Sequence, residues 1–282
     1  MNNKIKEAID ANIAVHSAMA DEYNKVEPHF RPESIQRVDN IIKEIHAQHP
    51  IEKVLDLGCG TGFMINIVKK YAHEITGVDV TQAMMDKVDK SGTAKIDLIN
   101  SDTGSVTLPK EHYDLATAYT FLDHLYDMEP TFVNTFNALK AGGRFYADLS
   151  PNFYFWDSVK KVDSSQQYDP ILQREINAVL SKDEEIQAQF GIEKETFRNA
   201  EHQKHIKGGL VEEELRSLLL KVGFKDVQFI YHWFIGQAQL INDQSKDKTI
   251  RFEQAAVMHD YLVRSLPISR NLFKYIGFIA IK

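Results

Sequence analysis

Residues 54–62, Val54-Leu-Asp-Leu-Gly-Cys-Gly-Thr-Gly62, decide how this chain folds. A short apolar run meets three glycines at every second position, and Asp56 stands two residues before the first of them. Such a run indicates a strand that turns tightly into a helix, with glycines that let a ligand approach the backbone amides where no Cβ intervenes. The segment predicts an α/β unit whose ligand loop contains Gly58, Gly60 and Gly62.

Strand and helix signals alternate on either side of this segment. Apolar runs bounded by turn residues lie at Lys53–Leu57, Glu74–Val78, Ala94–Ile99, Tyr113–Ala118 and Gly143–Leu149, and helical periodicity lies between them at Gly62–Tyr71, Gln82–Lys90 and Thr131–Leu139. Alternation of this kind is typical of βαβ units. We therefore expect a doubly wound α/β fold, with a mostly parallel sheet and helices on both faces.

The remaining segments read as additions to a single core. We expect residues 1–50 to be an N-terminal helical lid, 51–150 the cofactor-binding core, and 151–207 a helical insertion over the substrate. Residues 208–282 return to the core, with a strand at Phe224–Phe234, a helical excursion at 236–270 and a final strand at Tyr275–Ile281. These additions are expected to cover one edge of the sheet.

Composition excludes several classes of protein. The 282 residues are 43% hydrophobic and 26% charged, which excludes disorder and low complexity for the chain as a whole. Lys and Arg total 33 against 40 Asp and Glu, and this net charge of −7 argues against a broad nucleic-acid surface. We find no apolar run that would span a membrane and no signal peptide. With Cys59 as the single cysteine, we expect a cytoplasmic protein.

The spacing of the glycines and acids indicates the kind of ligand. A dinucleotide loop would place its third glycine one residue later, at Phe63, and Asp56 would repel a pyrophosphate. Asp56 is better matched to a cationic amine or sulfonium. Asp79 ends the next strand, 21 residues after Gly58, where an acid can accept both ribose hydroxyls.

With these motifs in place, the sequence resembles the class I S-adenosylmethionine-dependent methyltransferases, over most of residues 50–150 and 208–235. Leu55–Gly62 is similar to the family's first motif, Tyr113–Tyr119 to its fourth-strand motif, and Leu139–Phe145 to the turn into strand five. The resemblance implies a Rossmann-like sheet of seven strands, the last one inserted antiparallel between strands five and six. Residues 151–207 and 236–270 depart from the family by exceeding its minimal core.

The resemblance also implies an S-adenosylmethionine site over the carboxyl ends of strands one, two, four and five. Its expected residues are Tyr23, Asp56, Gly58, Cys59, Gly60, Asp79, Val80, Met84, Asp102, Thr103 and Tyr119. Within this set, Asp79 would bind the ribose, Met84 the adenine ring and Asp102 the exocyclic amine. Structural roles compete with these: Asp79 as a helix cap, Met84 in the core, and Tyr23 packed on it.

His124 is the candidate catalytic base. It follows strand four at the carboxyl edge, where a neutral imidazole could remove a proton from a hydroxyl or an ammonium, although a structural role is the alternative. His46/His49 and His202/His205 have a three-residue spacing that a metal could use. No carboxylate or cysteine completes either pair, so no metal is predicted.

The sequence therefore predicts methyl transfer from S-adenosylmethionine to the nitrogen or oxygen of a small-molecule acceptor. Its alternatives are a protein or RNA methyltransferase, an oxidoreductase of Rossmann type, and a non-enzymatic module that only binds the cofactor. Neither a nucleic acid nor a membrane is an expected partner. The sequence leaves the acceptor and the oligomeric state open.

Overall fold

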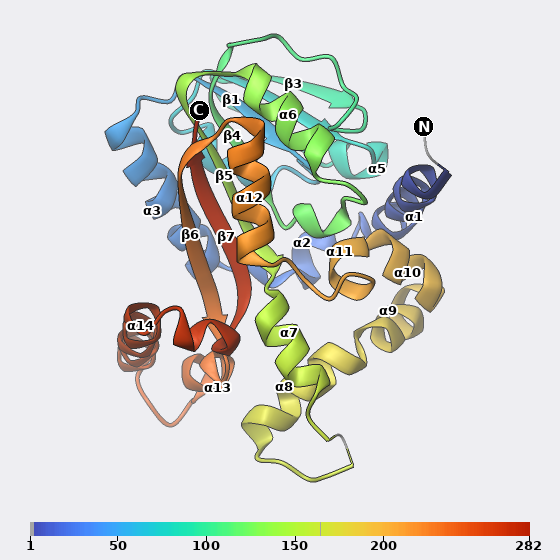
Figure 1. The fold of residues 1–282 in the computed structure, drawn as a ribbon, viewed down its shortest axis with the longest axis vertical. Helices are drawn as coiled ribbons and strands as arrows, with labels where there is room; N and C mark the ends of the chain where they lie inside the picture. Colours follow the sequence, from blue (N-terminus) through green and yellow to red (C-terminus); the bar gives the residue numbers. More distant parts are fainter. Residues whose placement is uncertain (1–2, 164) are drawn as a thin grey trace.

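The computed structural model describes residues 3–163 and 165–282, and one seven-stranded sheet organises it (Figure 1). The order is β3-β2-β1-β4-β5-β7-β6. The strands are β1 Lys53–Leu57, β2 Glu74–Asp79, β3 Lys95–Asn100, β4 Tyr113–Tyr119, β5 Leu139–Pro151, β6 Lys225–Phe234 and β7 Phe273–Ile281. β1 to β5 are parallel, and β7 pairs antiparallel with both β5 and β6, which confirms the expected fold.

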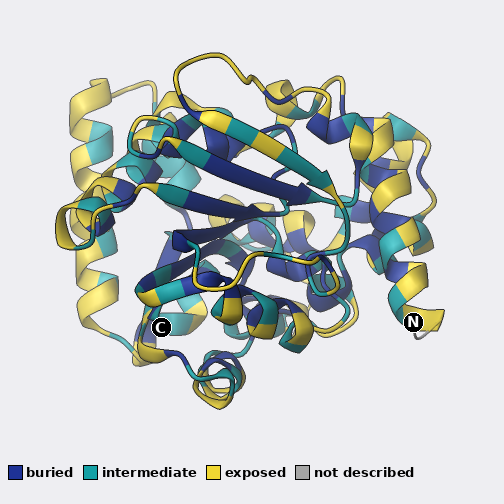
Figure 2. Cartoon of the chain, turned by 90° about the horizontal axis from the view of Figure 1, so that it is seen from above, coloured by how far each residue is buried: buried dark blue, intermediate teal, exposed yellow. Residues whose placement is uncertain are grey.

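Helices cover both faces of the sheet, and the strands between them are largely buried (Figure 2). On one face, α3 (Pro32–Gln48), α4 (Phe63–Val68) and α5 (Gln82–Met85) pack in a cluster that includes Val54 and Leu115. On the other, α6 (Glu129–Ala138) and α12 (Glu212–Val222) pack against Leu55 and Ala116. Successive strand residues thus enter opposite cores, as the strand period of two requires.

A helical roof stands over the carboxyl edge. It combines α1 (Asn3–Met19) and α2 (Tyr23–Val26) with α9 (Lys182–Phe190) and α10 (Lys194–Ala200). One hydrophobic cluster joins them, formed by Ala11, Val15, Met19, Ile186, Ile192, Phe197 and Ala200. Segments far apart in the sequence therefore build the roof together. We call α1, α2, α9 and α10 the roof helices.

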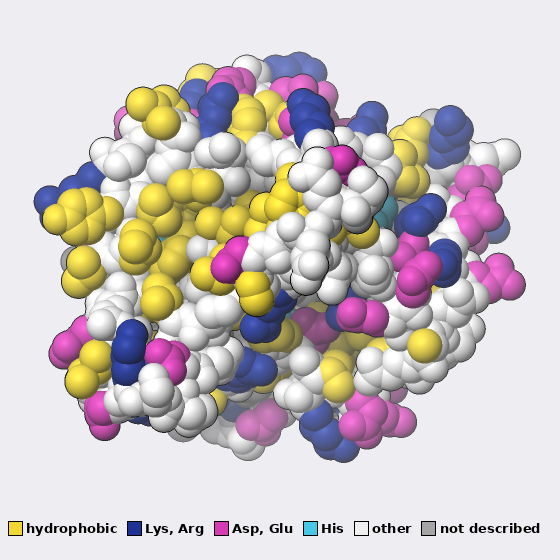
Figure 3. All heavy atoms as spheres, turned by 90° about the horizontal axis from the view of Figure 1, so that it is seen from below, with side chains coloured by type: hydrophobic (Ala, Val, Ile, Leu, Met, Phe, Trp, Pro, Cys, Tyr) yellow, Lys and Arg dark blue, Asp and Glu magenta, His cyan; other side chains and the backbone are white. Residues whose placement is uncertain are grey.

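The remaining helices extend from the same edge. α7 (Phe153–Lys160) and α8 (Pro170–Leu180) share a small core of their own, and α11 (His202–His205) lies next to η2 (Leu122–His124). α13 (Gln237–Asn242), α14 (Lys248–Arg264) and η3 (Ile268–Leu272) follow β6, and η1 (Pro28–Phe30) follows α2. α14 leaves Val257, Met258 and Tyr261 exposed, and Figure 3 shows hydrophobic side chains gathered on this side of the molecule.

Three expectations differ from the structure. α3 is not part of the helical lid expected over residues 1–50, because its Val38, Ile42 and Ile45 are buried against the sheet. The helix expected over Gln82–Lys90 ends at Met85, whereas β5 begins at Leu139 and is longer than the expected strand. Among the described residues, every helix is too short or too polar to cross a membrane.

Candidate active site

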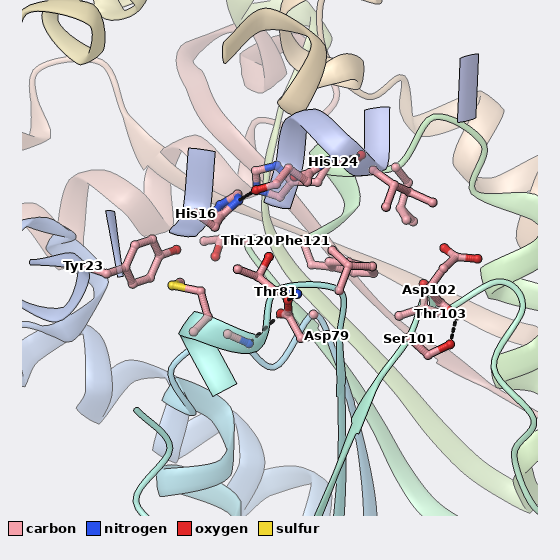
Figure 4. A pocket seen from close by; sticks show the side chains of 17 residues that line it. His16, Tyr23, Asp79, Thr81, Ser101, Asp102, Thr103, Thr120, Phe121 and His124 are labelled. Carbon is pink, nitrogen blue, oxygen red and sulfur yellow. Dashed lines mark hydrogen bonds between the residues drawn. The ribbon is translucent and has the colours of Figure 1, made fainter. Parts of the chain in front are cut away.

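A cavity lies where the carboxyl ends of β1, β2 and β4 meet α1 (Figure 4). It is lined by Ile9, Asn12, His16, Tyr23, Gly58, Gly60, Asp79, Val80, Thr81, Met84, Ser101, Asp102, Thr103, Thr120, Phe121, His124 and Leu125. Loops at the carboxyl edge of a parallel sheet are where ligands bind in such folds. No residue of β5 contributes to this lining, although the sequence placed the cavity over that strand as well.

The glycine loop forms the floor of the cavity. Gly58 has φ +66° and donates its N–H to the carbonyl of Val78 at 2.8 Å. A Cβ on Gly58 would lie 2.1 Å from the ring of Phe121, and one on Gly60 would point toward Met84 at 3.6 Å. Any side chain at Gly58 would therefore overlap Phe121, and one at Gly60 would occupy the space beside Met84.

Asp79, at the end of β2, braces this loop. Its Oδ2 accepts a hydrogen bond from the Gly60 N–H at 2.8 Å, and its Oδ1 accepts one from the Thr81 N–H at the same distance. A carboxylate has about four acceptor positions, so further donors can still be bound. Asp79 thus holds the loop in shape while lining the cavity as an acceptor.

The opposite end of the cavity is built from the segment after β3. Asp102 and Thr103 line it together with Ser101, as Figure 4 shows. The backbone here is anchored, because Asn134 donates its side-chain amide to the carbonyl of Thr103 at 2.9 Å. Met84 adds an apolar wall with 3% of its surface exposed. The acid and the thioether that the sequence assigned to adenine therefore line one cavity.

Three expected residues do not reach this cavity. Asp56 is buried on the α4 side of β1, where its Oδ1 accepts a hydrogen bond from Thr117 at 2.6 Å and its Oδ2 has no partner. The side chain of Cys59 packs under Gly77, because small residues are needed where the loop crosses β2. Tyr119 stacks on Phe63 and accepts a hydrogen bond from Arg37. Strand and loop alternation turns all three side chains into the core, away from the lining of the cavity.

Several lining residues were not identified from the sequence. Ile9, Asn12 and His16 come from one face of α1, with the spacing of three to four residues that a helix face requires. The sequence predicted a helical lid over residues 1–50, but the spacing alone did not show which face of α1 would meet the cavity. Thr120 has φ +48°, an uncommon conformation for a residue with a Cβ, and it lines the cavity just after β4.

Tyr23 and His124 approach the cavity from different elements. Tyr23 opens α2, and its ring packs edge-on to His29, with centroids 5.9 Å apart. Burial raises the pKa of the Tyr23 phenol well above its usual value, so the hydroxyl is neutral at pH 7. His124 ends η2, and its Nδ1 lies 2.9 Å from the carbonyl of Ala200. Both positions agree with the sequence expectation that these residues stand at the carboxyl edge.

The residues present fit an adenosyl ligand with a cationic head. Two acceptors, Asp79 and Asp102, are separated by an apolar wall, and glycine leaves the floor of the loop free of side chains. The carboxyl of Asp56 lies behind the loop in the core, where burial raises its pKa to about 7, so the acids that line the cavity are Asp79 and Asp102. Among the described residues, no group of three or more His, Cys, Asp or Glu side chains could hold a metal ion.

Comparison with known proteins relates residues 55–147, and the fold as a whole, to methyltransferases. A family model described as a methyltransferase domain matches residues 55–147. The ubiquinone biosynthesis O-methyltransferase of Coxiella burnetii is 28% identical over 104 residues, which cover 36% of this chain and 44% of that protein. The chain thus spans less than half the length of this curated relative.

Solved structures agree on the fold over most of the chain. A methyltransferase from Archaeoglobus fulgidus superimposes with a TM-score of 0.51 at 18% identity, covering 88% of this chain and 95% of that one. A methyltransferase from Thermotoga maritima gives 0.53 at 16% identity, covering 96% and 99%. Both are described as dependent on S-adenosylmethionine. Residues 55–147 therefore match a methyltransferase domain, and the chain has the fold of the class I S-adenosylmethionine-dependent methyltransferases, as the resemblance implied.

Proposed function

We propose that this protein transfers a methyl group from S-adenosylmethionine to the nitrogen or oxygen of a small-molecule acceptor. One observation carries the proposal: a single cavity gathers the glycine loop, Asp79, Met84 and Asp102 from three successive βα units. The matched domain supports it, since residues 55–147 contain all four of these features. A protein or RNA substrate is less favoured, because α1 and Tyr23 enclose the cavity on the acceptor side and the net charge is −7.

Each residue has a role set by its chemistry. Bound S-adenosylmethionine supplies an electrophilic methyl group on a cationic sulfur. Asp79 would accept hydrogen bonds from the ribose hydroxyls, Asp102 would accept one from the adenine amine, and Met84 would cover the adenine ring. The floor at Gly58 and Gly60 allows close approach, and Tyr23 and α1 exclude water. Holding reactants in line can contribute about 7–11 kcal/mol to lowering the barrier, so alignment is the main task of such a site.

His124 is our proposed base for an acceptor that arrives protonated. Its Nδ1 faces a carbonyl oxygen, which can only accept, so this nitrogen holds the proton and Nε2 carries the lone pair. His124 lines the same cavity as Asp79. A residue placed in this way can remove a proton from a bound acceptor at pH 7.

Calorimetric titration tests the cofactor assignment. S-adenosylmethionine and S-adenosylhomocysteine should bind the purified chain, NAD should not, and Asp79→Ala should weaken adenosyl binding at least about tenfold, because hydrogen bonds to a charged group contribute about 1.5–3 kcal/mol. Asp97→Ala, an exposed acid on β3, is the matched control and should bind as the unaltered chain does. Tight NAD binding without adenosyl binding would exclude a methyltransferase and favour the oxidoreductase alternative.

A further inference from the structure

Two imidazoles meet at the wall of the cofactor cavity. His16 comes from α1 and His124 from η2, and their ring centroids lie 4.8 Å apart in an edge-to-face arrangement. Both line the cavity, and Figure 4 shows them together on the side that faces Thr120 and Tyr23. The roof and the sheet edge each contribute one ring.

The backbone fixes the tautomer of both rings. The Nδ1 of His16 lies 3.0 Å from the carbonyl oxygen of Asn12, and the Nδ1 of His124 lies 2.9 Å from that of Ala200. A carbonyl oxygen cannot donate, so each Nδ1 must carry a proton, and in the neutral form of either ring the lone pair is on Nε2. The Asn12 side chain also donates to the carbonyl of His124 at 3.3 Å, which ties the two elements together.

Neither Nε2 atom has a hydrogen-bond partner among the described residues. Burial and the neighbouring His124 lower the pKa of His16, with Asp79 and Glu201 opposing, so His16 is neutral at pH 7. A neutral His16 with its lone pair on Nε2 therefore stands beside the ring of His124, whose Nδ1 also holds a proton. Such a pair matches a ligand that brings hydrogen-bond donors and a transferable proton, and it offers no donor from Nε2 to a carboxylate or phosphate.

Two carboxylates interact with the pair: Asp123 lies beside His124, and Glu27 interacts with His124 at longer range. Asp123 is 8% exposed, its Oδ1 has no hydrogen-bond partner, and the nearest cation-capable atom is Nε2 of His124 at 4.0 Å. Glu27 lies 3.8 Å from His29, which is neutral because burial lowers its pKa to about 4. Burial raises the pKa of Glu27, and the cations that oppose this shift, Lys182 and Lys204, act only from beyond salt-bridge distance. A buried carboxylate without a cation is costly, and a cationic ligand removes that cost.

The third acid of this region is already paired. Glu201 binds Lys204 at 2.6 Å and His205 at 2.9 Å, so it leaves no charge for a ligand to balance. Lys204 also lies 5.3 Å from the ring centre of Trp156, which completes its environment. Lys204 acts on Asp123 and Glu27 only from beyond salt-bridge distance, so these two acids are the least balanced charges of the region.

We propose that His16, His124, Asp123 and Glu27 form the acceptor subsite, and that the acceptor is a small amine that arrives as an ammonium ion. This inference rests on the proposed function and narrows its acceptor from nitrogen or oxygen to an amine nitrogen. A phenol or alcohol would satisfy the imidazoles but bring no cation of its own to Asp123 and Glu27. An ammonium satisfies both sets of groups.

The proton transfer that follows is balanced within the subsite. An N–H bond of the ammonium breaks, and the proton moves to Nε2 of His124 or His16, which becomes an imidazolium. The electron pair of the broken bond stays on nitrogen and makes it a neutral nucleophile. Asp123 and Glu27 then stabilise the imidazolium as they had stabilised the ammonium.

Binding of a matched probe pair tests the acceptor class without turnover. With S-adenosylhomocysteine present, 2-phenylethylamine should bind at least about tenfold more tightly than 2-phenylethanol, its neutral counterpart, in calorimetric titrations at pH 7. Asp123→Asn and Glu27→Gln should each reduce that preference several-fold and leave the affinity for S-adenosylhomocysteine unchanged. Glu44→Gln, at an exposed acid of α3, is the control and should keep the full preference.

Nitrogen NMR of the imidazoles tests the other half of the proposal on the unaltered chain, so it does not depend on how a variant folds. At pH 8 both rings should carry their proton on Nδ1, and adding the amine at pH 7 should protonate one of them. His16→Gln and His124→Gln assign the signals, and His73→Gln, an exposed histidine, should leave them unchanged. Nε2–H tautomers in both rings would overturn the proposal.

The outcomes separate this proposal from the one it rests on. If S-adenosylhomocysteine does not bind, the proposed function fails, and the amine titration is run on the chain alone to decide the subsite. If S-adenosylhomocysteine binds and the amine shows no preference over the alcohol, the acceptor assignment is wrong and the cofactor assignment stands.

Discussion

At the scale of single residues, the site depends on what a side chain would displace. Gly58 combines φ +66° with a Cβ position 2.1 Å from Phe121, so both backbone conformation and space exclude any larger residue. The three glycines could be recognised in the sequence because a position that excludes a Cβ must be glycine. Asp56 shows the limit of such reasoning. The sequence showed an acid before the glycine loop, but it did not show that this acid is buried beside Thr117.

Gly58→Ala should therefore damage the loop more than its size suggests. Overpacking costs about 1–3 kcal/mol and a positive φ in a residue with a Cβ adds about 1–2 kcal/mol. We expect a lower midpoint of thermal unfolding and at least tenfold weaker adenosyl binding. Gly92→Ala shares the positive φ, at +112°, but has nothing within 4 Å, so it isolates the backbone part. Equal losses in the two variants would contradict the steric argument.

The buried carboxyl of Asp56 should make stability depend on pH. Burial raises its pKa from 3.8 to about 7, against the opposing hydrogen bond from Thr117. The folded state then binds more protons than the unfolded state between these values, so stability falls as pH rises through this window and levels off above it. The penalty is at most about 4 kcal/mol. Asp56→Asn should flatten the profile of unfolding free energy between pH 4 and 7, and an unchanged slope would refute the assignment.

At the scale of elements, strand positions were predictable and helix positions were not. The apolar run at Lys53–Leu57 coincides with β1 because a strand buried on both faces leaves a continuous apolar signature. α3 shows an equally clear apolar stripe, yet the stripe gives no indication of whether it meets the sheet or covers the ligand. Arg37 fixes α3 against the sheet, because its guanidinium pairs with Asp148 of β5 at 2.9 Å. Tertiary contacts of this kind lie outside local sequence patterns.

Arg37 should therefore be a strong stability determinant of α3. Asp148 is fully buried and also lies 3.2 Å from Nε2 of His232, so removing the guanidinium leaves the carboxylate only partly compensated, at a cost of up to about 3–5 kcal/mol. We expect Arg37→Met to lower the unfolding free energy by that amount in denaturant titrations, and Asp148→Asn in the same chain to recover part of it. Lys161→Met breaks the exposed pair with Asp157 and should cost less than about 1 kcal/mol. Similar losses in both would show that burial does not matter here.

At the scale of the whole molecule, two layers of different stability are expected. The sheet and its flanking helices form the large cores, whereas the roof helices are joined by a separate, smaller cluster. The sequence predicted helical additions over 1–50 and 151–207 but not that α1 and α10 pack on each other. Local patterns specify each helix, and only the assembled sheet edge brings the two segments together.

Phe197→Ala should open the roof without unfolding the sheet. This ring is 3% exposed and lies in the roof cluster, so its removal costs about 3–5 kcal/mol locally. We expect faster amide exchange in α1, α9 and α10 and about tenfold weaker adenosyl binding, with the exchange of β1 and β4 unchanged. Phe132→Ala, at a fully buried core position, should instead lower the stability of the whole chain. Uniform exchange changes after Phe197→Ala would mean that roof and sheet unfold as one unit.

The insertion of β7 between β5 and β6 also sets an order of events during synthesis. Arg144 pairs with Ile281 and Lys225 with the same residue, so neither neighbouring strand can complete its hydrogen bonds until residues 273–281 have left the ribosome. Until then, two strand edges with apolar residues such as Phe145 and Phe229 stay open. A nascent chain stalled before residue 273 is therefore expected to be bound by chaperones and to aggregate when released, even though it already holds every residue that lines the cavity.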